Sequence, residues 1–202
     1  MKPIVSILAV MALCSAAQAN LVVNGDFESD PQGTGWTEWW DSPNSDIGDH
    51  ATEYGGTAGL NREAVVYWND SGYFQDIPIN TPGIYRLSGS ILTNSQFPLV
   101  DGRIARLSAE VGDGPGVNWW QVNLELTDAA TPDTYFPMEA LIDLTDPVNT
   151  NVRINLYLVD TAGPASGTGY FDNISLELVP EPATLSLLGL GGLALIRRHR
   201  NH

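Results

Sequence analysis

Short alternating segments constrain the fold of this chain more than any other feature. No 3.6-residue hydrophobic period is sustained between Asn20 and Leu178, so an amphipathic helix is not predicted there. Apolar and polar residues instead alternate over short stretches separated by Gly, Pro, Asn and Asp, the pattern of half-buried strands. The predicted strands are Leu21–Val23, Trp36–Trp40, Ala64–Trp68, Gly72–Ile77, Ile84–Leu92, Ala105–Val111, Trp119–Leu126, Phe136–Asp143, Val152–Val159 and Tyr170–Leu178. This predicts an all-β domain, a two-sheet antiparallel β-sandwich of the jelly-roll type.

The N-terminal end has the pattern of an export signal. Residues 1–19 begin with a charged start, continue with a short apolar stretch and end in a small-residue site at Ala17 and Ala19, which is typical of a signal peptide cleaved after that site. A lipoprotein signal through Cys14 is the alternative, although Leu13 occupies the position where such a signal has a small residue. The sandwich domain is therefore predicted to span residues 20–178.

The C-terminal end, residues 179–202, combines three features in a fixed order. Pro180, Glu181 and Pro182 precede the apolar run Ala183–Ile196, and arginines follow it. As a helix this run would span about 21 Å, shorter than the ~30 Å hydrocarbon core of a bilayer. The order resembles the PEP-CTERM sorting tail of Gram-negative bacteria.

That resemblance implies a sequence of processing steps. A tail of this kind implies cleavage near Pro180, Glu181 and Pro182 by an exosortase-type membrane protease. It also implies a precursor held transiently at the inner membrane, and a product at the cell surface or in an exopolysaccharide matrix. An ordinary single-span anchor is the alternative interpretation of the same short hydrophobic helix.

Composition excludes several classes of function. The chain has 24 Asp and Glu against 9 Lys and Arg, a net charge of −15, which disfavours nucleic acid as a partner. Its one cysteine, Cys14, lies in the signal peptide, and His50 is the only histidine before the tail. No G-x-S-x-G, H-E-x-x-H or P-loop pattern occurs. A non-catalytic protein is therefore predicted, and a glycan-active Asp/Glu pair is a distant alternative.

Strand alternation predicts a polar outer face with aromatic residues on it. Alternate side chains leave opposite sides of a strand, so polar and aromatic residues of three strands are expected to point away from the core while Trp120, Val122, Leu124 and Leu126 point inward. The outward residues are Trp119, Gln121, Asn123, Arg153, Asn155, Tyr157 and Arg106. Such a face suits a sugar, because its C–H groups stack on rings and its hydroxyls bond to planar polar groups. An ordinary solvated face with two scattered aromatics is the alternative.

The strand motifs resemble a known family over nearly the whole domain. The opening Asn20-Leu-Val-Val-Asn-Gly-Asp-Phe-Glu28, the middle Phe74-Gln75-Asp76-Ile77 with Pro82–Gly89, and the closing Tyr170–Glu177 resemble exported carbohydrate-binding modules with the galactose-binding-like jelly roll. The resemblance implies that fold and a polysaccharide ligand. It also implies a structural calcium site, for which Glu28 and Asp172 are the matching ligands.

The alternation of the last strand gives the calcium prediction a physical reason. Asp172 shares its parity with Ile174 and Leu176 and is therefore predicted to point inward, where an unpaired carboxylate is costly. Calcium would satisfy it together with Glu28, backbone carbonyls and, as a further candidate, Asp26. The alternative is that these carboxylates accept backbone N–H bonds in turns.

The function predicted from sequence is therefore an exported, non-catalytic cell-surface or matrix protein that binds polysaccharide through its outer aromatic and amide face. A purely structural acidic protein crosslinked by divalent cations is the alternative. Ice binding is disfavoured because no predicted outward face is rich in threonine.

Overall fold

The computed structural model describes residues 19–29, 33–39, 45–48, 62–67, 72–112, 120–159 and 167–180. The chain divides into two units, residues 20–177 and the two terminal segments 1–19 and 178–202. Of the terminal segments only residues 19 and 178–180 are described.

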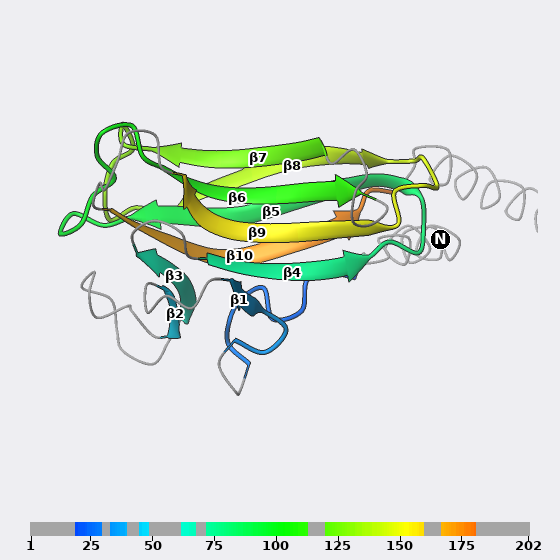
Figure 1. Cartoon of the computed structure of the whole chain (residues 1–202), viewed down its shortest axis with the longest axis horizontal. Coiled ribbons are helices and arrows are strands. Elements are labelled where there is room, and N and C mark those ends of the chain that lie inside the picture. The colour runs from blue at the N-terminus through cyan, green and yellow to red at the C-terminus, as the bar shows by residue number, and fades with distance from the viewer. Residues whose placement is uncertain are drawn as a thin grey trace, which may run out of the picture. The chain divides into compact units, whose positions relative to one another are not determined.

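Two five-stranded antiparallel sheets pack face to face (Figure 1). Sheet A has the order β1-β4-β9-β6-β7, and sheet B has the order β2-β3-β10-β5-β8. The strands are β1 (Thr37–Trp39), β2 (Ser45–Gly48), β3 (Glu63–Tyr67), β4 (Gly72–Pro78), β5 (Gly83–Thr93), β6 (Ile104–Gly112), β7 (Trp120–Thr127), β8 (Phe136–Leu144), β9 (Asn151–Val159) and β10 (Thr168–Leu178). No helix occurs among the described residues. The predicted two-sheet sandwich is confirmed.

Two short segments differ from the sequence prediction. β2 was not predicted, because Ile47 is its one apolar residue and alternation gives no signal there. It forms by pairing with β3, where Ser45 lies opposite Val66. Conversely, Leu21–Val23 forms no strand, although the Leu21 N–H donates to the carbonyl of Leu176 on β10 at 2.9 Å.

The core lies between the sheets and follows the predicted alternation of the long strands. On β9, Val152, Ile154 and Leu156 are fully buried, and each large aliphatic side chain buried this way stabilises the fold by about 1.5–3 kcal/mol. Trp120 lies on the core side of sheet A as predicted, since it pairs with the buried Val111, but it is 38% exposed. It is the first residue of the edge strand β7, which enters the core only from Leu124 onward.

A buried glutamine ties the first segment of the domain, residues 20–29, to sheet A. Gln75, on β4, accepts a hydrogen bond from the Val23 N–H (2.8 Å) and donates to the carbonyls of Val23 (3.0 Å) and Gly35 (2.9 Å). Neither Val23 nor Gly35 lies in a strand, so Gln75 supplies the hydrogen bonds that a neighbouring strand otherwise would.

The same segment is also tied to sheet B. The Asn20 side chain accepts a hydrogen bond from the Leu176 N–H (3.0 Å), and the Ile174 N–H donates to the Gly25 carbonyl (2.8 Å). A Cβ at Gly25 would lie 2.0 Å from the Ile174 carbonyl oxygen. The glycine of the opening motif is therefore required by the close approach of two backbones.

Candidate functional site

The outer face of sheet A brings most of the predicted ligand-binding residues together. Partners across an antiparallel ladder lie side by side on one face. Tyr157 of β9 lies opposite Arg106 of β6, which lies opposite Glu125 of β7. The same pairing joins Arg153 to Glu110 and Gln121, and Asn155 to Ser108 and Asn123. Trp119 lies outside the described residues.

Tyr157 is held by two neighbours on this face. The Arg106 guanidinium donates to the Tyr157 hydroxyl (3.0 Å) and to the Glu125 carboxylate (2.8 Å), and its central carbon lies 5.5 Å from the centroid of the Tyr157 ring. Gln121 also donates to the Tyr157 hydroxyl (3.1 Å). The half-buried ring is thus fixed in orientation by charge-assisted and neutral hydrogen bonds.

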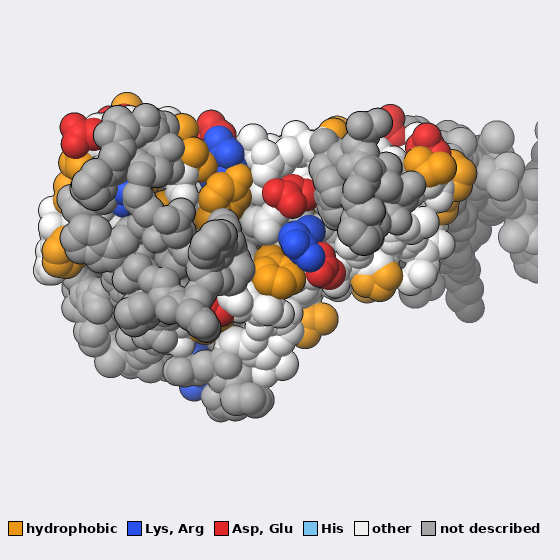
Figure 2. All heavy atoms as spheres, viewed as in Figure 1, with side chains coloured by type: hydrophobic (Ala, Val, Ile, Leu, Met, Phe, Trp, Pro, Cys, Tyr) orange, Lys and Arg blue, Asp and Glu red, His pale blue; other side chains and the backbone are white. Residues whose placement is uncertain are grey.

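Arg153 forms a second arginine-centred group. Its guanidinium donates to both oxygens of Asp76 (2.8 and 2.9 Å) and lies over the Phe74 ring, 4.4 Å from its centroid. The hydrogen bond from Arg153 holds the pKa of Asp76 below its ordinary value. Figure 2 shows basic side chains on this side of the molecule lying directly against acidic ones, with hydrophobic side chains beside them.

Gln121 bonds to residues of β6 and β9 on this face, and Asn155 lies beneath the surface. The Gln121 amide is within bonding distance of Ser108 (3.2 Å), Glu110 (3.2 Å) and the Tyr157 hydroxyl. Asn155 points to the outer side as predicted but is only 7% exposed, because longer neighbours surround it and its amide turns to Ser108 (3.4 Å). A ligand would therefore meet Gln121, Tyr157 and the arginines before it met Asn155.

The acidic residues predicted to bind calcium lie close enough to affect one another. Asp172 is 7% exposed, and its carboxylate accepts hydrogen bonds from the backbone N–H (2.7 Å) and the side-chain amide (2.8 Å) of Asn173. Burial and the charges of Glu28 and Asp26 raise the pKa of Asp172 to about 6, against the opposing effect of the Asn173 bond. Glu28 accepts a hydrogen bond from the Arg62 N–H at 2.5 Å.

The prediction that Asp172 points into the core between the sheets is wrong, although its burial was expected. A Cβ at Gly169 would meet Ala105 of sheet A, so Gly169 and Phe171 face the core and Asp172 faces the outer side of sheet B. Ile174 is buried in the core beside Leu107. Strict alternation from Phe171 would instead place Ile174 on the outer side. Asn173, with φ 54°, interrupts the alternation like the extra residue of a β-bulge.

Two residues near Asp172 gave no signal in the sequence. Tyr135 donates to the carboxylate of Glu63 at 3.0 Å, and Glu63 is buried. Burial, followed by the charges of Glu63 and Asp172, raises the pKa of Tyr135 well above its ordinary range. Tyr135 lies between strands and Glu63 at the start of one, so alternation could not group them.

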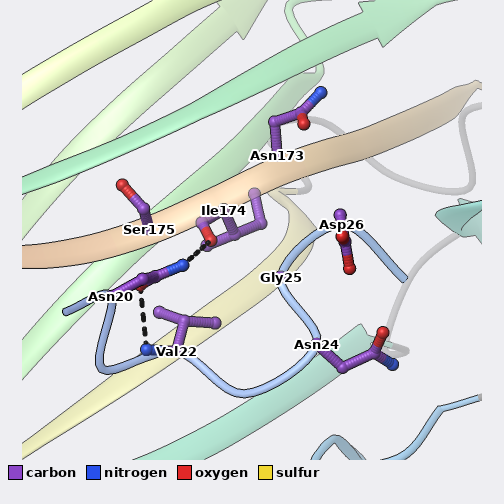
Figure 3. Close-up of a pocket in the computed structure, with 8 residues that line it drawn as sticks. All are labelled: Asn20, Val22, Asn24, Gly25, Asp26, Asn173, Ile174 and Ser175. Atoms are coloured by element: carbon purple, nitrogen blue, oxygen red, sulfur yellow. Dashed lines mark hydrogen bonds between the residues drawn. The ribbon is translucent and has the colours of Figure 1, made fainter. Parts of the chain in front are cut away.

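A hollow of about 350 Å³ lies between the first segment and β10, with Asp26 on its wall (Figure 3). It is lined by Asn20, Val22, Asn24, Gly25, Asp26, Asn173, Ile174 and Ser175. The amide of Asn20 is used internally, since it donates to the Ile174 carbonyl (3.2 Å) and accepts from the Val22 N–H (3.0 Å). In the part of the chain that the structure describes, no group of three or more His, Cys, Asp and Glu side chains is arranged to hold a metal ion.

Comparison with known proteins identifies the tail and the fold. Residues 178–201 match the PEP-CTERM protein-sorting motif, and no curated protein matches the sequence. Two similar solved structures are TmCBM61 in complex with beta-1,4-galactotriose (16% identity, 80% of this chain and 99% of that chain, TM-score 0.55) and family 16 carbohydrate-binding module-2 (17%, 78% and 99%, TM-score 0.51). The CBM22-2 xylan-binding domain of Paenibacillus barcinonensis Xyn10C is also similar (9%, 80% and 98%, TM-score 0.51).

The domain thus has the jelly-roll fold of carbohydrate-binding modules, as the sequence predicted. The chain joins that fold to a PEP-CTERM motif, which indicates an exported protein that is processed at a membrane. Among the described residues no helix is long and apolar enough to cross a bilayer. The predicted apolar run Ala183–Ile196 lies outside those residues.

Proposed function

We propose that this chain is an exported, non-catalytic protein that binds polysaccharide on the outer face of sheet A. The observation that carries the proposal is the gathering of Tyr157, Gln121, Arg106 and Arg153 on one face of a sandwich whose structural neighbours are carbohydrate-binding modules. The sorting motif adds an exosortase-type protease as a partner, with a transient stay at the inner membrane of a Gram-negative cell. The product then belongs to the cell surface or the exopolysaccharide matrix.

The geometry supports binding by a prepared surface. The Tyr157 ring is oriented before a ligand arrives, because Arg106 and Gln121 hold its hydroxyl. A pre-oriented ring and amide lose little conformational entropy on binding. Exposed Gln121 and Asn123 supply the planar polar groups that bond to sugar hydroxyls.

The charge state of the face supports a non-catalytic role. A glycosidase needs a carboxylic acid with a raised pKa beside a second carboxylate. Here the hydrogen bond from Arg153 lowers the pKa of Asp76, and Glu125 is paired with Arg106 at 2.6 Å. Asp76 is therefore held as an anion and is poorly suited to protonate a leaving group.

Affinity electrophoresis of the mature domain through gels containing neutral or acidic glycans tests the binding proposal. Retardation by at least one glycan is expected, with Tyr157→Ala and Gln121→Ala each weakening it by about tenfold, or about 1.4 kcal/mol. Trp119→Ala should weaken it as well. Arg86→Ala is the matched control, because Arg86 pairs with Glu139 on the outer face of sheet B. No retardation by any glycan would reject the proposal.

We propose further that calcium binds between the first segment and β10, with Glu28 and Asp172 as carboxylate ligands and Asp26 as a third candidate. The Asp172 carboxylate supports this, since burial first, and then the charges of Glu28 and Asp26, raise its pKa. The donor set of carboxylates and backbone carbonyls is the one calcium prefers. Bound calcium would act as a structural staple in a domain that has no cysteine.

Thermal melting with and without calcium tests this site. Calcium should raise the melting temperature of the wild type and EDTA should reverse the rise. Asp172→Asn should abolish the response, and in EDTA it should melt no lower than the wild type, because it removes a carboxylate repelled by its neighbours. An unchanged calcium response in Asp172→Asn would reject this ligand. Calcium-dependent self-association without any glycan effect would favour the crosslinked structural protein instead.

A further inference from the structure

The two arginines of the outer face of sheet A are occupied by carboxylates of the same face. Arg153 places two of its nitrogens on the two oxygens of Asp76, which is the bidentate geometry that a guanidinium otherwise offers to a ligand carboxylate or phosphate. Arg106 directs one nitrogen to Glu125 at 2.8 Å, a second to the same oxygen at 2.6 Å and a third to the Tyr157 hydroxyl. Neither guanidinium presents an open fork to an incoming anion.

Carboxylates also outnumber guanidinium groups on the described part of this face. Asp76 and Glu125 balance the two arginines, and Glu110 adds a further negative charge directly opposite Arg153 in the ladder. Glu110 accepts a hydrogen bond from the Gln121 amide at 3.2 Å. The net charge of the whole chain, −15, adds long-range repulsion of the same sign.

The groups of this face that remain open to a ligand are therefore mainly hydrogen-bond acceptors. Glu110 retains a second carboxylate oxygen, and Gln121 bonds to Ser108, Glu110 and Tyr157 through its side-chain nitrogen, so its side-chain oxygen points to the ligand side as an acceptor. These acceptors match ligand groups that donate, namely hydroxyls and amines. An anionic group would have to displace Asp76 or Glu125 from its arginine and would be desolvated beside Glu110, a repulsive arrangement that discriminates against it.

We propose that the outer face of sheet A selects glycans that carry no anionic group, with Asp76 and Glu110 as the residues that exclude uronates, sulfates and phosphates. This inference rests on the proposed function and adds the chemical class of the ligand. In this role Arg106 and Arg153 are positioning residues that fix Tyr157 and Phe74.

A panel of glycans that differ in charge tests the proposal on the mature domain. The neutral members are β-1,4-galactan, xylan, β-glucan and fully methyl-esterified polygalacturonate, and the anionic members are alginate and unesterified polygalacturonate. Each is cast into affinity gels at low salt and at about 0.5 M NaCl, which shortens the Debye length to a few ångströms. The domain should bind the anionic members at least about tenfold more weakly than the best neutral member at both salt concentrations.

A matched pair of variants separates the local effect from net charge. Asp76→Asn opens the fork of Arg153 and should gain retardation by polygalacturonate. Glu139→Gln removes the same charge from an exposed pair on sheet B, where Arg86 lies 3.6 Å away, and should gain nothing. A melting curve confirms that each variant is folded.

The outcomes distinguish the inference from the function on which it rests. Binding of anionic glycans as tight as that of neutral ones overturns the inference and leaves polysaccharide binding intact. Anionic binding that appears only at high salt, or equal gains in both variants, also overturns it, because the exclusion would then be long-range. Retardation by no member of the panel overturns the proposed function itself.

Discussion

Replacing Gln75 by methionine tests how the first segment is held to the sandwich. The side chain is buried and makes three hydrogen bonds, one from the Val23 N–H and two to the carbonyls of Val23 and Gly35. Methionine has nearly the same length, so Gln75→Met leaves no large cavity and removes the polar contacts alone. At about 1 kcal/mol for each hydrogen bond, the free energy of unfolding should fall by about 3 kcal/mol. In a domain of this size that corresponds to a melting temperature lower by roughly 6–12 °C.

Urea unfolding of the mature domain measures this change, with thermal melting as a second readout. Asn123→Ala is the control, because Asn123 is exposed on the outer face of sheet A and its loss should change stability by less than about 0.5 kcal/mol. A loss below about 1 kcal/mol in Gln75→Met would show that water replaces the glutamine and that the segment is held by other contacts. Equal losses in the two variants would refute the argument from burial.

Two further predictions concern backbone contact and charge. Gly25→Ala should lower the free energy of unfolding in urea by at least about 3 kcal/mol, more than a left-handed φ costs, because its Cβ would lie 2.0 Å from the Ile174 carbonyl oxygen. Gly33→Ala is the control and should lower it by only about 1–2 kcal/mol, the cost of a left-handed φ. Similar losses in both variants would contradict the predicted contact. The pKa of Asp76 is lowered by its bond to Arg153, so the stabilisation from this pair is present above the ordinary aspartate pKa and is lost as the pH falls through the lower pKa of the folded state. Acid titration of stability in Asp76→Asn should lack that loss, and a double-mutant cycle at neutral pH should give about 0–1 kcal/mol for the exposed pair.

The long strands could be predicted from sequence because each carries several alternating apolar residues. β9 and β6 each present such a series to the core, and their outward residues followed from the same parity. Parity failed where the backbone departs from a regular strand. The positive φ of Asn173 reverses the direction of Asp172. Parity also gives no measure of burial, and Trp120 is exposed although it lies on the core side, because it begins an edge strand.

The candidate site was predictable as a set of residues and not as a set of contacts. Strand parity indicated that Tyr157, Gln121 and Arg106 share a face, but it contains no information on register between strands. Register determines that Arg106 lies between Tyr157 and Glu125, and therefore that its guanidinium is occupied. Equally, burial of Asn155 depends on the size of its cross-strand neighbours, which only the assembled sheet defines.

The hydrogen bond between Asn20 and Leu176 joins residues 156 positions apart in the chain. Contacts at such a separation form late, because most of the chain must be ordered before its ends can meet. Under the export from the N-terminus that residues 1–19 predict, the first segment would stay unbound until the last strand had followed it across the membrane. Completion of the domain and arrival of the sorting motif at the membrane would then be linked in time, since Leu176 precedes the motif by only two residues.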